Sequence, residues 1–313
     1  MRALFVTSNR IGDAVLTSGV LGHLLDAHPG LRTTIACGPA AAPLFEAVPA
    51  REATIALAKA PLKAHWFALW AQCLPRVWDI VVDMRGSGLA WFLAAKKRAI
   101  LSGRDDARHR VEDAARVLGL SPAPSPRLWL TDSAKARARA LTGDGPLLVL
   151  GATANWPGKV WPAANFVELA RRLLAGPLAG ARVAIVGGPS ERALAEPLLR
   201  EGALDLVGTE DLGVVAAAIA RATLYVGNDS GLMHVAAASG VPTLGLFGPS
   251  EDRHFRPWGP NAAFVRTPES KAELFAKIEF QPRHAQGLMD SLSVDTVEAA
   301  AVSLLARAPA RAA

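Results

Sequence analysis

The sequence contains few cysteines, and their placement argues against two kinds of small scaffold. Only two, Cys37 and Cys73, occur among 313 residues, with neither CxxC spacing nor a neighbouring histidine pattern. Neither a disulfide framework nor a structural zinc site is therefore indicated. Because unpaired cysteines are typical of reducing compartments, we expect a cytoplasmic protein.

Long apolar runs are also absent. The first residues contain only about five apolar side chains in a row, too few for the core of a signal peptide. No uninterrupted apolar run reaches the roughly 18 residues that a membrane-spanning helix needs, so no span is expected. A hydrophobic fraction of 51% with 20% charged residues indicates an ordered globular protein. The length suits two domains of about 150 residues.

The formal net charge of +6 favours an anionic partner, such as nucleic acid, a membrane surface or a phosphorylated substrate. Zinc-finger spacing, an RNP1-like aromatic run and long Lys/Arg tracts are all absent, so we do not expect nucleic-acid binding. Lys96, Lys97 and Arg98 could form a basic patch, or they could simply be the solvated end of a helix.

Short apolar strands alternate with helical segments, which predicts an α/β protein with doubly wound parallel sheets. Four prolines between residues 120 and 146 indicate a linker with one short helix. We therefore predict two Rossmann-like domains, 1–142 and 143–313, facing each other across a cleft. A final helix at 294–306 could pack back on the first domain, whereas residues 268–290 have no readable pattern. In the first domain, helices are expected at 12–28, 40–47, 63–74, 86–95 and 107–118, with a strand at 98–102.

The segment ATLYVGNDSGLMHVAAASGVPTLGLFGPS, residues 222–250, has the pattern strand, polar turn, helix, glycine, strand. Asp229, Ser230 and Gly231 follow the strand at a helix start, where free N–H groups attract anions, so a phosphate or a polyol could bind there. An ordinary helix N-cap is the alternative. His234 lies one helical turn beyond Ser230, and it could equally be a helix histidine with structural contacts. Without a GxSxG elbow, a serine hydrolase is disfavoured.

Two other turns also follow predicted strands. Gly12 and Asp13 open the first helix, where Asp13 either faces a ligand or complements the helix dipole. At Gly187 and Glu191, in the turn VGGPSER, a nucleoside could stack on glycine backbone while the carboxylate accepts a hydrogen bond from a ribose.

The loop GATANWPGKVWPAANF, residues 151–166, offers Thr153, Lys159 and backbone N–H groups, which suits a diphosphate. Its spacing departs from that of a Walker A loop, because Val160 stands where Ser or Thr would follow the lysine. A plain surface lysine is the alternative for Lys159. The sequence also lacks GxGxxG and DxD, so an ordinary NAD site and a metal-bridged diphosphate are both disfavoured.

Taken together, four segments resemble glycosyltransferase family 9, the ADP-heptose:lipopolysaccharide heptosyltransferases. They are GDAVLTSGVLGHLLDAHPG, GATANWPGKVWPAANFVELARRL, VAIVGGPSE and NDSGLMHVAAASGVPTLGLFGPSE. The resemblance implies a GT-B fold, a nucleotide-sugar donor held by the second domain, an acceptor held by the first, and inverting, metal-independent transfer without a cofactor. It also implies cytoplasmic location with peripheral contact at the inner face of the inner membrane, and a lipopolysaccharide inner-core acceptor.

By motif position, the resemblance assigns Asp13 as the catalytic base and makes Glu191 a nucleoside contact. The other donor contacts that it implies are Thr153, Lys159, Gly187, Asp229, Ser230, Gly231 and His234. Our candidates for acceptor binding are Gly12, Lys96, Lys97 and Arg98. The chain departs from the family in a short region after residue 102 and in the lack of a cysteine-containing turn within 267–290, which leaves acceptor and donor sugar open. Alternatives are a GT-B-like transferase or epimerase for another nucleotide sugar, and a non-catalytic nucleotide-binding module.

Overall fold

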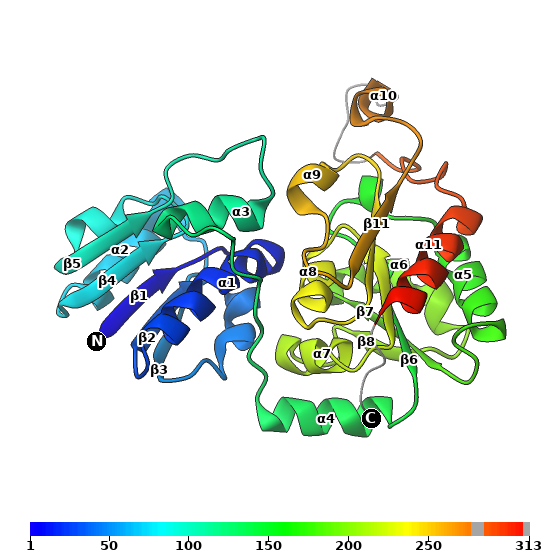
Figure 1. Ribbon diagram of the computed structural model, residues 1–313, viewed down its shortest axis with the longest axis horizontal. Coiled ribbons are helices and arrows are strands. Elements are labelled where there is room, and N and C mark those ends of the chain that lie inside the picture. The colour runs from blue at the N-terminus through cyan, green and yellow to red at the C-terminus, as the bar shows by residue number, and fades with distance from the viewer. Residues whose placement is uncertain (277–284, 309–313) are drawn as a thin grey trace. The chain divides into compact units, whose positions relative to one another are not determined.

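The chain folds into two compact units, seen in a computed structural model that describes residues 1–276 and 285–308 (Figure 1). Each unit is built on a parallel sheet with helices packed against it, which confirms the predicted pair of α/β domains. No helix within the described residues is both long enough and apolar enough to cross a membrane.

The units divide between Thr131 and Asp132, earlier than the predicted boundary at 142/143. The helix between these two points, α4 (Asp132–Thr142), packs against α7 (Leu212–Ile219) and so belongs to the second unit. Arg137 reinforces this packing by donating a hydrogen bond from Nε to Glu210 Oε1 at 3.1 Å. The proline-rich segment predicted as a linker does contain the division between the units. The sequence alone did not show which of the two units α4 would pack against.

The first unit contains five parallel strands in the order β3-β2-β1-β4-β5. The strands are β1 (Arg2–Val6), β2 (Arg32–Cys37), β3 (Arg51–Ala56), β4 (Trp78–Asp83) and β5 (Ala95–Ile100). The α-helices are α1 (Ile11–Ala27), α2 (Ala64–Cys73) and α3 (Arg110–Ala115), and the 3-10 turns are η1 (Pro39–Phe45), η2 (Pro61–Lys63), η3 (Leu89–Phe92) and η4 (Arg116–Leu118).

Two predicted helices of this unit are shorter or absent. Residues 86–95 form only η3, because Gly86 and Gly88 adopt positive φ angles of 57° and 79°, which a right-handed helix cannot contain. The strand that we expected at 98–102 therefore begins earlier, at Ala95. The helix expected at 40–47 is the 3-10 segment η1, which has Pro43 inside it.

The second unit contains six parallel strands in the order β11-β10-β9-β6-β7-β8. They are β6 (Leu147–Gly151), β7 (Arg182–Gly187), β8 (Leu204–Val207), β9 (Leu224–Asn228), β10 (Thr243–Phe247) and β11 (Ala262–Arg266). The remaining helices are α5 (Ala163–Ala175), α6 (Arg192–Leu199), α8 (Gly231–Ala238), α9 (Asp252–Phe255), α10 (Lys271–Ala276) and α11 (Val294–Arg307), with the turns η5 (Pro157–Lys159) and η6 (Pro189–Glu191).

The central strands of this sheet are buried along their whole length. Every residue of β6, β9 and β10 is buried, which is why these segments read as nearly continuous apolar runs. The final helix, α11, packs on α5 and on β11 and so covers the sheet of the second unit. Trp161 fixes the start of α5, because its Nε1 donates to the Leu292 carbonyl at 2.8 Å and its ring meets Phe166 edge-on.

Candidate functional site

All the residues predicted to hold a donor lie at the carboxyl ends of three adjacent strands of the second sheet. The loop after β6 carries Thr153 and Lys159, the end of β7 and the turn η6 carry Gly187 and Glu191, and the segment after β9 carries Asp229, Ser230, Gly231 and His234. Open α/β sheets bind their ligands at this edge, outside the carboxyl ends of the strands.

Lys159 and Asp229 form an ion pair that joins two of these loops. Lys159 Nζ donates to Asp229 Oδ2 at 2.6 Å, and the two side chains are 26% and 7% exposed. A lysine ammonium has three N–H donors, so one bond to a carboxylate leaves donors for phosphate oxygens. The cation is thus already placed in a site that excludes most water, where its attraction for an anion is stronger than in bulk solvent.

Asn228 anchors the same loop from inside the sheet. Its Oδ1 accepts a hydrogen bond from the Trp161 backbone N–H at 3.1 Å, and the residue is fully buried. The Asn228 Nδ2 group has no hydrogen-bond partner among the described residues. Sequence reasoning assigned no role to Asn228, although a buried amide at the end of a strand, directly before Asp229, was the available signal.

A second contact joins the loops after β6 and β7. Thr153 Oγ1 donates to Glu191 Oε2 at 2.6 Å, and the same oxygen accepts from the Gly188 N–H at 2.9 Å. No described residue bonds Glu191 Oε1, so this oxygen can accept a hydrogen bond from a ligand hydroxyl. Gly187 makes the contact possible, because a Cβ there would lie only 2.7 Å from Thr153 Oγ1.

Tyr225, the sole tyrosine of the chain, lies beneath this edge and was also missed by sequence reasoning. Its hydroxyl lies against Gly227 and so close to Gly151 that a Cβ on Gly151 would overlap it. Burial raises the pKa of Tyr225 above its ordinary value; the nearby Ser230 hydroxyl opposes this rise, and the charge of Glu191 adds to it. The Ser230 hydroxyl is close but lacks hydrogen-bond geometry, and no described residue satisfies the tyrosine hydroxyl. Tyr225 therefore stays protonated at neutral pH.

The start of α8 is open to a ligand. Ser230 occupies the N-cap position with extended backbone, but its side chain makes no capping hydrogen bond, and the Asp229 carboxylate bonds Lys159 instead. Neither side chain therefore caps the helix, which disfavours the ordinary N-cap alternative. The first-turn N–H groups and the positive end of the helix dipole remain for an anion, next to Gly231. His234 lies one turn further along and is buried.

In the first unit, Asp13 lies in the first turn of α1, after the carboxyl end of β1. Ser8 Oγ approaches its Oδ2 at 3.4 Å, a long hydrogen bond. No described lysine or arginine pairs with the Asp13 carboxylate, which is partly exposed beside Gly12. An exposed carboxylate without a counter-charge can accept a proton from a ligand hydroxyl.

The structure does not bring Lys96, Lys97 and Arg98 to this end of the sheet. They occupy the second, third and fourth of the six positions of the edge strand β5, where Lys97 pairs in register with Ile80. Lys96 Nζ bonds Asp79 at 2.7 Å, and the Arg98 guanidinium donates to the carbonyls of η3 and the residues around it. Their proposed contact with an acceptor stays a prediction.

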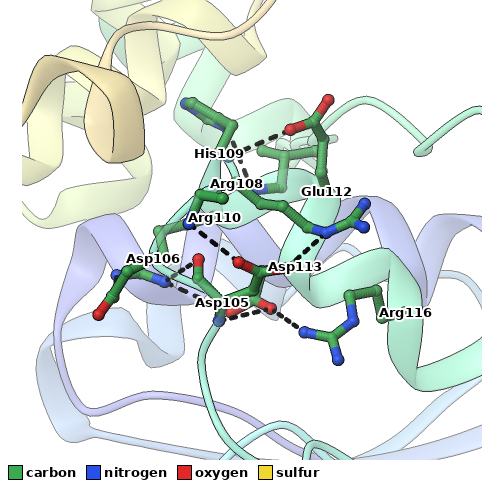
Figure 2. A network of polar contacts seen from close by, with 10 residues as sticks. Asp105, Asp106, Arg108, His109, Arg110, Glu112, Asp113 and Arg116 are labelled. Atoms are coloured by element: carbon green, nitrogen blue, oxygen red, sulfur yellow. Dashed lines mark hydrogen bonds and ion pairs between the residues drawn. The ribbon is translucent and has the colours of Figure 1, made fainter.

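The loop that follows β5 is held by a dense polar network at the start of α3 (Figure 2). The buried Asp113 carboxylate accepts hydrogen bonds from Arg116 at 2.9 Å and from the Asp105 N–H at 3.3 Å. The hydrogen bond from the Ala107 N–H, and to a lesser extent the one from the Arg108 side chain, holds the pKa of Asp105 below its usual value. The basic side chains of this region therefore balance local carboxylates rather than forming an open positive patch.

Comparison with known proteins agrees with this geometry. Residues 66–282 match the family model described as glycosyltransferase family 9 (heptosyltransferase). The lipooligosaccharide heptosyltransferase 2 of Haemophilus influenzae is 31% identical over 159 residues, which is 48% of this chain and 45% of that protein. The chain thus spans less than half the length of this relative.

Two solved structures share the fold. The glycosyltransferase family 9 protein from Veillonella parvula superposes with a TM-score of 0.79 at 23% identity, covering 97% of both chains. The Escherichia coli heptosyltransferase WaaC with ADP superposes with a TM-score of 0.73 at 22% identity, covering 97% of this chain and 100% of that one. These likenesses confirm the GT-B fold class that the four sequence segments imply.

The packing of Tyr225 against Gly151 leads to a test of the site's architecture. We expect Gly151→Ala to destabilise the protein by about 1–3 kcal/mol, because its methyl group would overlap the Tyr225 hydroxyl. Adding Tyr225→Phe removes that oxygen and should recover part of the loss, although the ring carbon that carried it remains 2.8 Å away. Urea denaturation of the two single variants and the double variant measures this coupling.

Gly145→Ala is the matched control, because a Cβ at this position meets nothing within 4 Å. It should leave stability nearly unchanged. An equal loss in both glycine variants, or no recovery in the double variant, would contradict the contact.

Proposed function

The chain belongs to glycosyltransferase family 9, and from that premise we propose that it transfers heptose from ADP-heptose to the anionic inner core of a lipopolysaccharide acceptor. One observation supports the proposal more strongly than the others. The Lys159–Asp229 pair lies at the carboxyl edge of the second sheet, just before the uncapped start of α8, and this arrangement supports binding of an anion there. The related WaaC structure, solved with ADP, supports a diphosphate as that anion.

The two contact pairs suggest how a donor would be held. Lys159 and the first N–H groups of α8 would bind the diphosphate. The Lys159 ammonium would then donate to the phosphate oxygens as well as to Asp229. Glu191 would accept from a ribose hydroxyl through Oε1, while Thr153 and Gly188 fix its other oxygen. The buried Tyr225 hydroxyl stays a neutral donor beneath these loops.

The proposed reaction is a single displacement with inversion. As the acceptor hydroxyl attacks the anomeric carbon, Asp13 takes its proton, a new glycosidic C–O bond forms, and the bond to the diphosphate breaks. ADP leaves with that electron pair, and Lys159 and the helix N–H groups stabilise the charge that develops on it. These positive groups could perform this task without a metal ion. Within the described residues, no three side chains of His, Cys, Asp or Glu gather as metal ligands.

The donor assignment predicts that Lys159→Ala weakens ADP binding about tenfold to a hundredfold, because a charge-assisted hydrogen bond to phosphate is lost. Part of this loss should come from the Asp229 carboxylate, which is left unpaired beside the phosphates. Lys159→Ala with Asp229→Asn should therefore bind ADP more tightly than Lys159→Ala alone. Calorimetric titration measures the ADP affinity of the wild type, of Lys159→Ala and of the double variant.

The matched control is Lys135→Ala, which removes an exposed lysine of the same unit that pairs with Asp132. It should bind ADP as the wild type does. Unchanged ADP affinity in Lys159→Ala would remove this lysine from the diphosphate site.

The base assignment predicts that Asp13→Asn lowers the rate of transfer by roughly two to four orders of magnitude while ADP affinity stays the same. Transfer is measured as heptose incorporated into the acceptor under saturating donor. Asp26→Asn, which alters an exposed carboxylate of the same helix, should keep nearly full activity.

One outcome would contradict the base assignment, and another would contradict the transfer reaction itself. Near-normal transfer by Asp13→Asn would show that the base is another group. Rapid consumption of ADP-heptose by the wild type without acceptor would favour hydrolysis or epimerisation over transfer.

A further inference from the structure

Buried polar atoms without a hydrogen-bond partner gather at the carboxyl edge of the second sheet. Among the described residues of this unit they include the Tyr225 hydroxyl of β9, Nδ2 of Asn228 at the end of the same strand, and Oγ of Ser250, three residues after β10. Buried polar groups in native proteins are nearly always paired, so exceptions call for an explanation. A ligand bound at this edge would supply one.

Two glycines let the Tyr225 ring lie along the sheet toward this edge. Gly151 of β6 pairs in register with Gly227 of β9. A Cβ on Gly227 would lie 2.7 Å from the Tyr225 hydroxyl oxygen, and a Cβ on Gly151 would overlap that oxygen. Residues two apart on a strand share a face, so the ring runs from Tyr225 over Gly227 toward the carboxyl end of β9. The hydroxyl thus reaches the level of Gly151, the last residue of β6.

Ser230 is the polar side chain that this hydroxyl approaches. It occupies the N-cap position of α8, and its own side chain makes no capping hydrogen bond. The Ser230 hydroxyl opposes the rise that burial causes in the pKa of Tyr225, which places the two hydroxyls close together, although they do not meet the geometry of a hydrogen bond. A serine hydroxyl has one donor and two acceptor lone pairs, so Ser230 can accept from Tyr225 and still donate to another group.

Glu191 is the other polar group near the tyrosine, and it is a weaker candidate for a partner. Its carboxylate acts on the pKa of Tyr225 through its charge. Its Oε2 already accepts hydrogen bonds from Thr153 Oγ1 and from the Gly188 N–H. The Ser230 hydroxyl, by contrast, caps nothing and lies at the helix start where an anion is proposed to bind.

We infer that Tyr225 is a positioning residue for the diphosphate of the donor and acts through Ser230. When the anion binds at the start of α8, the Tyr225 O–H donates to Ser230 Oγ, and the Ser230 O–H donates to a diphosphate oxygen. Each hydroxyl polarises the next in such a chain, which strengthens both hydrogen bonds. This inference rests on the proposed function, because it takes the anion to be the diphosphate of a nucleotide sugar.

The test is calorimetric titration of the full chain with ADP. Tyr225→Phe should weaken ADP binding about threefold to tenfold, which corresponds to the loss of one net hydrogen bond. Ser230→Ala should weaken binding at least as much. The double variant should bind ADP about as well as Ser230→Ala alone, because without Ser230 Oγ the tyrosine hydroxyl has no route to the anion.

A second measurement separates this role from a purely structural one. The Tyr225 hydroxyl has no partner among the described residues, so removing it relieves an unpaired buried group. Tyr225→Phe should therefore leave the urea midpoint of unfolding without ADP unchanged or raise it. A side chain that only supported the fold would lose stability and ADP affinity together.

The matched control is Ser239→Ala at the other end of α8, where Ser239 Oγ donates to the Ala236 carbonyl at 2.7 Å. This variant should bind ADP as the wild type does. Adding Tyr225→Phe to it should weaken ADP binding by the same factor as Tyr225→Phe alone.

Three results would overturn the inference: wild-type ADP affinity in Tyr225→Phe, losses that multiply in Tyr225→Phe with Ser230→Ala, or a lower unfolding midpoint in Tyr225→Phe. Each of them leaves ADP binding by the wild type intact, and so leaves the proposed donor standing. Absence of ADP binding by the wild type would contradict the proposed donor itself, and the inference with it.

Discussion

Parallel strand pairing is the constraint on which the candidate site depends. Because every strand of a sheet runs in the same direction, all loops after the strands gather at one edge. In the second unit β6 lies between β9 and β7. Its loop can therefore reach both neighbours, through Lys159 to Asp229 after β9 and through Thr153 to Glu191 after β7. The order of the strands thus selects which polar side chains pair.

This constraint also explains what the sequence could predict. The alternation of strand-like and helix-like segments can be read locally from the sequence. It predicts which loop follows the carboxyl end of each strand. The residues from Thr153 to His234 that we predict to hold the donor were placed at one sheet edge for this reason, and their roles were proposed by resemblance to a family. The role of Tyr225 could not be predicted, because its hydroxyl meets Gly151 across the pairing of β9 with β6, and strand order and register were not known in advance.

The remaining differences have local or tertiary causes. Residues 86–95 have the composition of a helix, but two glycines with positive φ leave only a short turn before β5. Helix α4 was predicted correctly as a short helix. The unit to which it belongs, however, is decided by its packing against α7, which is distant in sequence.

In this family 9 chain, a lysine, a carboxylate and an open helix start lie at a single sheet edge. We propose that this edge holds an ADP-sugar. The most direct measurement is the thermal unfolding of the full chain with ADP-heptose, UDP-glucose and GDP-mannose at equal concentration. At a hundredfold excess over its dissociation constant, ADP-heptose should stabilise the chain by about 2.7 kcal/mol, with a smaller effect from the other two. No stabilisation by ADP-heptose, or an equal effect of all three, would contradict selective binding of an ADP-sugar at this edge.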